Sequence, residues 1–329
     1  MQPFEYQRAQ DASGVISALR QSPNAKILAG GTNLLDLMKQ DVEKPSHLID
    51  VNRLQLAEIE ELPDGGLRLG ALARNSDTAD HPLVRKNYPM LAQAILSGAS
   101  PQLRNMATNG GNLLQRTRCY YFYDPAFTQC NKRNPGSGCG AIHGYNRIHA
   151  ILGASPDCIA TNPSDMCVAL SALAATVRVR GPRGERMIPF NEFHRLPGTT
   201  PEIDTNLQPD ELILSIDLPK SPYAAHSTYI KVRDRASYAF ALVSVAAALE
   251  LDGDTIRSAR LALGGVALKP WRAENAEHVL AGKPMNTDTF RMAATEALTG
   301  AHAYEYNGFK IEMAKQTIVR AFTVAGGQS

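Results

Sequence analysis

The chain has 329 residues, which at about 150 residues per domain predicts two or three domains. Hydrophobic residues make up 44% of it and charged residues 20%, close to the average of soluble globular proteins, which argues against disordered, collagen-like and coiled-coil architectures. Lysine and arginine number 34 and aspartate and glutamate 32, so the net charge is only +2. This balance argues against nucleic acid or an anionic membrane as the main partner.

The N-terminus and the apolar runs predict neither export by a signal of the chain's own nor a membrane span. Glu5 and Asp11 stand where a signal peptide needs a basic and then an apolar region. The longest apolar stretch, 240–249, is far shorter than the roughly 20 residues that cross a bilayer. We expect it to be a buried strand.

The first part of the chain predicts a mixed α+β domain. Asp11 is placed to cap a short helix, and a buried strand over 26–29 runs into a Gly30-Gly31 turn. Thr32 and Asn33 can cap the helix that follows. Further elements expected in chain order are a helix over 34–39, a strand over 47–51, a hairpin over 56–71 and a helix over 89–99.

Residues 119–158 lose periodicity and contain four of the five cysteines. An irregular stretch of this length inside a compact domain is typically functional, disordered or held by another group. No Cys-x-x-Cys pair occurs, so zinc-ribbon and ferredoxin spacings fail. Four thiols on one loop are nevertheless able to close around one metal centre, with scattered buried cysteines as the alternative. Cys167 lies on an apolar helix expected after Ser164 and is the one most typical of a core residue.

The second part of the chain predicts a separate α+β domain, because strands are followed by helices. Proline and glycine residues between 195 and 210 indicate a connection. We therefore expect a domain over 1–195 that contains the cysteine loop 119–158, a connection over 196–222 and a C-terminal domain over 223–329. A strand over 175–179 is expected before the connection. Beyond it we expect strands over 212–218, 228–232, 239–251 and 258–263, and helices over 272–280, 289–299 and 308–323.

Two double-glycine turns, in 29–34 and 108–112, are the first candidate binding motifs. Glycine lets a backbone approach a ligand closely, and successive N–H groups can hold a pyrophosphate. Either turn alone is more typical of an ordinary tight turn, and neither matches Gly-x-Gly-x-x-Gly or a P-loop. Two such turns in one domain favour a shared dinucleotide ligand. From the residues alone, Asp165 is a helix-start residue and the charge run 231–235 a solvated edge.

The motifs together resemble a known family over nearly the whole chain. The two turns, Pro163-Ser-Asp165, Tyr229-Ile-Lys231 and Leu263-Gly-Gly-Val266 are similar to the FAD-binding medium subunit of the xanthine oxidase family. The run from Cys119 to Cys139 resembles the flavin subunit of bacterial molybdenum-dependent aldehyde oxidoreductases, which carries a [4Fe–4S] cluster beside FAD. The resemblance implies an α+β fold, with a FAD-binding domain of two α+β subdomains of the vanillyl-alcohol-oxidase/CO-dehydrogenase flavoprotein type and a C-terminal α+β domain.

The resemblance also implies the cofactor residues. It places Asp165 at the flavin end, Lys231 at the flavin or its ribityl chain, and the backbone of Ile213 beside the ring. The residues it assigns to FAD are Lys26, Ile27, Leu28, Ala29, Gly30, Gly31, Thr32, Asn33, Leu34, Thr108, Gly110, Gly111, Asn112, Asp165, Ile213 and Lys231. The residues it assigns to the cluster are Cys119, Cys130, Cys139 and Cys158. It assigns no catalytic residue beyond FAD.

The function implied by the resemblance is electron transfer within a heterotrimeric oxidoreductase. A large molybdenum-cofactor subunit oxidises an aldehyde, a small [2Fe–2S] subunit delivers the electrons, and this chain passes them through FAD to an external acceptor. The resemblance implies a periplasmic complex, co-exported with a signal-bearing partner, with the cytoplasm as the alternative. Two other functions stay open: a self-contained FAD-dependent NAD(P)H reductase, and a non-enzymatic interaction subunit stapled by zinc.

Overall fold

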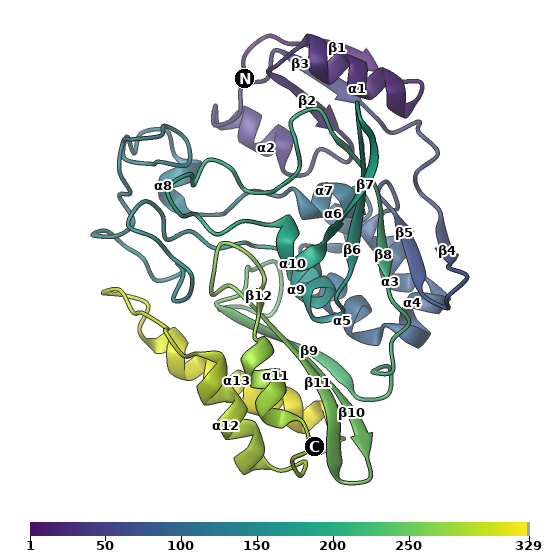
Figure 1. Cartoon of the computed structure of the whole chain (residues 1–329). Helices are drawn as coiled ribbons and strands as arrows, with labels where there is room; N and C mark the ends of the chain where they lie inside the picture. Colours follow the sequence, from purple (N-terminus) through teal and green to yellow (C-terminus); the bar gives the residue numbers. More distant parts are fainter. Residues whose placement is uncertain (328–329) are drawn as a thin grey trace.

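The computed structural model describes residues 1–327 and confirms the α+β architecture (Figure 1). The N-terminal sheet has the strand order β1-β3-β2 and is parallel throughout. Asp11 caps the first helix as expected, since its Oδ1 accepts from the backbone N–H of Gly14 at 2.8 Å. The elements of this part are β1 (Glu5–Arg8), α1 (Ala12–Gln21), β2 (Ala25–Leu28), α2 (Leu34–Lys39) and β3 (His47–Asp50).

A five-stranded antiparallel sheet follows, with the order β4-β5-β8-β6-β7. Its strands are β4 (Ile59–Glu61), β5 (Leu67–Gly70), β6 (Thr176–Gly181), β7 (Gly184–Pro189) and β8 (Leu212–Leu218). Its helices are α3 (Asn75–Asp80), α4 (Pro82–Asn87), α5 (Pro89–Ser97), α6 (Pro101–Arg104), α7 (Asn109–Leu113), α9 (Asp165–Ala172) and α10 (Phe190–Phe193).

Strand β8 differs from the expected organisation, because it lies inside the expected connection 196–222. It pairs with β5 on one side and with β6 on the other, at the centre of the sheet. Turn-forming residues indicate where regular structure is interrupted. They do not indicate the sheet to which the next strand returns.

The cysteine loop projects from the sheets around α8 (Tyr120–Tyr123), at the left of Figure 1. Apart from this short helix, residues 119–158 have only isolated backbone bridges. Cys130 pairs with Cys139, and Ser155 pairs with Cys158. The loss of periodicity in the sequence therefore corresponds to an irregular loop.

The C-terminal part is an antiparallel sheet with the order β12-β11-β10-β9 and three helices on one face (Figure 1). Its strands are β9 (Ser227–Val232), β10 (Val243–Asp252), β11 (Thr255–Gly264) and β12 (Trp271–Arg272). Its helices are α11 (Glu274–Leu280), α12 (Thr287–Ala297) and α13 (Phe309–Ala325). Within residues 1–327, no helix is both long enough and apolar enough to cross a membrane.

The side chains of β10 alternate between two cores, as the period of two in a strand requires. Val243, Val245 and Leu249 pack in the core shared with the C-terminal helices. Ala246 and Ala248 face the opposite way and belong to the core of the five-stranded sheet, with α5 and α9. Residues 243–249 of the apolar stretch are thus buried on both faces and join the two parts of the chain, whereas Phe240, expected in the same buried strand, precedes β10 and is exposed.

Candidate cofactor sites

A cavity of about 1290 Å³ lies between the parts of the chain and is lined by all sixteen residues that the resemblance assigns to FAD. Both glycine turns, Asp165, Ile213 and Lys231 contribute to its wall. Its volume exceeds the roughly 300–1,000 Å³ typical of sites for drug-sized ligands, which suits a molecule as large as a dinucleotide. The structure thus brings these residues together, although they come from distant positions in the sequence.

The first glycine turn presents free backbone donors to this cavity. Among residues 1–327, no acceptor is hydrogen-bonded to the backbone N–H groups of Gly30, Gly31, Thr32 and Asn33. Gly31 has a φ of +70°, which glycine adopts without strain. Four consecutive donors on a half-buried turn need an acceptor, and a pyrophosphate provides one.

Gly30 is required for a different reason, namely the close approach of the two turns. A Cβ atom at this position would lie 1.9 Å from the backbone oxygen of Met106. At Gly111, by contrast, the nearest atom to an added Cβ is the Oγ1 of Thr108, at 3.0 Å. Gly30 therefore allows the two turns to pack against each other, whereas the absence of a side chain at Gly111 leaves space on the cavity side.

The second turn is fixed by polar side chains. Thr108 caps α7, accepting the N–H of Gly111 at 3.3 Å. Asn112 donates to Asn75 Oδ1 at 2.7 Å and accepts from the Ser164 hydroxyl at 2.6 Å. The turn is thereby tied to the start of α9, where Asp165 lies.

Asn33 does not cap α2, contrary to expectation. Its backbone is in the α region and its side chain makes no capping hydrogen bond. Instead Oδ1 accepts from the backbone N–H of Arg116 at 2.8 Å, and Nδ2 donates to the Tyr123 hydroxyl at 3.3 Å. Tyr123 lies on α8, one turn after Cys119, so Asn33 connects the first glycine turn to the cysteine loop.

Asp165 and Lys231 form a buried ion pair, so the expectation of a solvated edge at Lys231 is wrong. Lys231 Nζ donates to Asp165 Oδ2 at 2.8 Å and to the Ser97 carbonyl at 3.0 Å. The other carboxylate oxygen accepts from the Tyr229 hydroxyl at 2.7 Å. Burial, together with the Asp165 charge, raises the pKa of Tyr229 well above its usual value. The pair puts both charges at the cavity wall and links the two parts of the chain.

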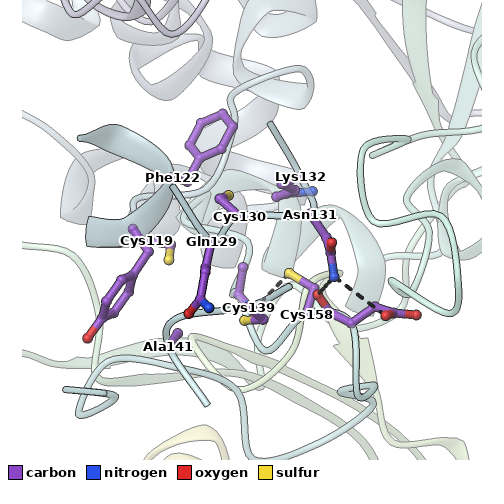
Figure 2. Close-up of a pocket in the computed structure, with 12 residues that line it drawn as sticks. Cys119, Phe122, Gln129, Cys130, Asn131, Lys132, Cys139, Ala141 and Cys158 are labelled. Carbon is purple, nitrogen blue, oxygen red and sulfur yellow. Dashed lines mark hydrogen bonds between the residues drawn. The ribbon is translucent and has the colours of Figure 1, made fainter. Parts of the chain in front are cut away.

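Four cysteines line a second, much smaller pocket, shown in Figure 2. They are Cys119, Cys130, Cys139 and Cys158, and all are free thiols. Tyr121 and Phe122 from α8 also line this pocket. Cys167 does not: it is fully buried on α9, among the side chains of the main core, as expected.

Burial opposes ionisation of two of these thiols, Cys119 and Cys158. It raises the pKa of Cys119 to about 12 and that of Cys158 to about 11. Metal binding requires thiolates, so it releases protons. Its free energy must exceed the free energy needed to deprotonate the buried thiols. Lys132 also lines this pocket, and its charge favours the thiolate form of Cys158.

Four cysteine sulfurs are the donor type of both a tetrahedral zinc site and an iron–sulfur cluster. Within residues 1–327, no three His, Cys, Asp or Glu side chains are placed to hold one metal ion. A single zinc ion needs its sulfur ligands at about 2.3 Å from one point. A [4Fe–4S] cluster binds one cysteine at each iron, so its four ligands stand further apart around a shared body.

The sequence interpretation missed a partly buried charge network between the two sites. Arg116 pairs with Glu43 and, at 2.9 Å, with Asp204, and Lys132 pairs with the same aspartate. Although burial opposes it, the charges of Lys132 and Arg116 hold the pKa of Asp204 below its usual value. Two arginines directly before Cys119, in the run Arg116-Thr-Arg118, could have indicated this charge network.

Comparisons with known proteins agree with this geometry. Residues 2–221 match the model for the FAD binding domain in molybdopterin dehydrogenase, and residues 228–325 match the CO dehydrogenase flavoprotein C-terminal domain. The chain is 50% identical to the aldehyde oxidoreductase FAD-binding subunit PaoB of Escherichia coli, over 100% of both chains.

More distant relatives match over most of the chain. The glyceraldehyde dehydrogenase medium chain of Sulfolobus acidocaldarius is 30% identical, over 89% of this chain and 86% of that one. The solved carbon monoxide dehydrogenase of Hydrogenophaga pseudoflava superposes with a TM-score of 0.78 at 28% identity, covering 99% of this chain and 98% of that one.

Proposed function

Because this chain belongs to the FAD-binding medium subunits of the xanthine oxidase family of molybdenum dehydrogenases, we propose that it is the FAD- and [4Fe–4S]-carrying electron-transfer subunit of an aldehyde oxidoreductase. The family and the oxidoreductase class rest on matches that span nearly the whole chain. The cluster, the aldehyde substrate and the direction of electron flow are our inference. FAD accepts one or two electrons and an iron–sulfur cluster accepts one, so the pair can join one-electron and two-electron partners.

The observation that carries the proposal is the contact between the two candidate sites. Asn33, on the turn with free N–H groups, hydrogen-bonds Tyr123, and Tyr123 lies on the helix that begins after Cys119. The Tyr123 hydroxyl also donates to Asp36 at 2.7 Å. Side chains of the cysteine loop therefore form part of the wall of the FAD cavity. This contact supports two redox groups held side by side in one chain.

Within this proposal, the chain's residues bind and shield the cofactors. The first turn would donate its backbone N–H groups to the FAD pyrophosphate, with Thr108, Gly110, Gly111 and Asn112 opposite. Cys119, Cys130, Cys139 and Cys158 would bind the cluster, and Phe122 would keep water from it. The ion pair of Asp165 and Lys231 would fix the wall beside the flavin end.

The proposed partners are a large molybdenum-cofactor subunit and a small [2Fe–2S] subunit that supplies electrons, with an external acceptor beyond FAD. We propose a periplasmic complex, exported on a partner's signal. Fractionation of cells that express the whole complex tests this location, and recovery of the chain in the cytoplasm alone would contradict it.

The decisive experiment measures the cofactors of the purified full chain. Flavin bands, a broad brown absorption and about four irons per chain are expected. Flavin without iron would favour a self-contained reductase. Bound zinc in a colourless protein would favour an interaction subunit that zinc stabilises. We expect serine at Cys119, Cys130, Cys139 or Cys158 to remove or degrade the cluster. Cys167→Ala is the matched control: it should keep the iron and cost about 1 kcal/mol as a small core substitution.

A further inference from the structure

One side-chain nitrogen lies against a sulfur atom of the four-cysteine pocket. His149 Nε2 is 3.1 Å from Cys119 Sγ, a hydrogen-bonding distance for sulfur. His149 is 1% exposed and Cys119 is 8% exposed, so water does not compete for this contact. The Sγ of Cys158 accepts instead from the backbone N–H of Ala160 at 3.5 Å. Among residues 1–327, His149 is the side chain with a nitrogen hydrogen-bonded to one of these four sulfurs.

The position of His149 is fixed by the C-terminal part of the chain. Its backbone carbonyl accepts from Lys310 Nζ at 2.7 Å and from Asn307 Nδ2 at 3.4 Å. Lys310 lies in the first turn of α13 and Asn307 just before this helix, and both are fully buried. The backbone N–H of His149 donates to the Asn146 carbonyl at 3.0 Å. Both backbone polar groups of His149, the carbonyl and the N–H, are therefore fixed by hydrogen bonds.

The imidazole ring is confined as well. Tyr120 packs against it edge-on, with the ring centroids 6.5 Å apart, and Tyr121 packs at 6.3 Å. The other ring nitrogen, Nδ1, is buried and has no hydrogen-bond partner in the described part of the chain. The contact with Cys119 is therefore the hydrogen bond that orients the ring.

A cysteine that ligates iron is a thiolate, which can only accept a hydrogen bond. We propose that His149 donates its Nε2–H to Cys119 Sγ and thereby raises the reduction potential of the cluster. This inference rests on the proposed function, because it requires the cluster. A donor to a ligand sulfur stabilises the more negative, reduced cluster more than the oxidised one, because charge strengthens a hydrogen bond. His149 is thus a positioning and tuning residue rather than a ligand.

The test compares His149→Leu, which has no donor, with His149→Gln, which keeps an N–H at the end of the side chain. His47→Leu is the matched control, because His47 is also buried with one unpaired ring nitrogen but lies in β3, away from the cysteines. Each full chain is purified without oxygen, its iron and flavin are measured, and the cluster is titrated by EPR against solution potential.

We expect His149→Leu to keep its iron and to lower the ratio of reduced to oxidised cluster at a fixed potential about tenfold, a shift of 59 mV for one electron. His149→Gln should lie close to the wild type. Equal potentials for His149→Leu and His47→Leu, with iron present in both, would overturn this inference but leave the proposed function standing. A wild-type chain without iron would overturn both.

A second measurement needs no substitution. Pulsed EPR on the wild-type chain labelled with ¹⁵N-histidine should show a nitrogen coupled to the reduced cluster, and His47→Leu should retain it. Absence of this coupling in an iron-loaded chain refutes the hydrogen bond, even if the His149 variants fail to fold.

Discussion

Removal of one partner of the buried ion pair should cost far more stability than removal of an exposed lysine. The side chains of Lys231 and Asp165 are 4% and 7% exposed, and Lys231 Nζ lies 2.8 Å from the carboxylate. In Lys231→Met, the carboxylate stays buried with Tyr229 as its remaining side-chain donor. Breaking a buried pair in this way costs about 3–5 kcal/mol. Exposed Lys86→Met should change the free energy of unfolding by no more than about 0.5 kcal/mol.

The assay is urea unfolding of the full chain followed by circular dichroism, with FAD at one saturating concentration, because bound ligand itself shifts stability. The double variant Asp165→Asn/Lys231→Met removes both charges and should recover more than half of the loss. A loss in Lys231→Met within 1 kcal/mol of that in Lys86→Met, or a double variant as unstable as the sum of the singles, would refute the reasoning.

Two further predictions concern the glycine turns and a buried histidine. Gly30→Ala should fail to fold normally, because its Cβ would lie 1.9 Å from the Met106 oxygen, whereas Gly111→Ala should fold and bind FAD about tenfold more weakly by fluorescence titration. Normal folding and flavin content in Gly30→Ala would contradict this. Burial lowers the pKa of His194 to about 4, from 6.5, so its contribution to stability is present above pH 6.5 and is lost as the pH falls towards 4. Compared with His194→Gln, the wild type should lose on the order of 2–3 kcal/mol more between pH 7 and pH 4 in urea unfolding, and parallel pH profiles would exclude the role of His194.

Local patterns predicted the elements better than the contacts between them. The helix over 34–39 and the capped helices after Asp11 and Ser164 follow from side-chain types a few residues apart, and the structure confirms them. Lys231 was misread because its partner, Asp165, lies 66 positions away. Periodicity within a strand indicates which side chains share a face, but not what that face meets.

In the candidate sites too, local features could be predicted from the sequence, whereas contacts between distant segments could not. The double-glycine turns are visible in the sequence, and the φ of +70° at Gly31 favours glycine locally, so this part of the cavity wall was foreseeable. The bonds from Asn33 to Arg116 and Tyr123 were not, because 83 and 90 positions separate the partners. The four cysteines are brought to one pocket by a loop without regular hydrogen bonding, which no periodic signal describes.

The alternating faces of β10 limit how the gene for this protein can be divided. A break between 222 and 227 would separate the two parts, but it would expose Ala246 and Ala248 on one fragment and the packed side of α9 on the other. It would also separate Lys231 from Asp165 and leave a charge without its partner on each fragment. We expect chimaeras that exchange the C-terminal part between relatives to succeed when these small side chains and this pair are exchanged together. The contact between β10 and α9, with the pair of Lys231 and Asp165, must therefore be inherited as a whole, with the residues of both parts of the chain.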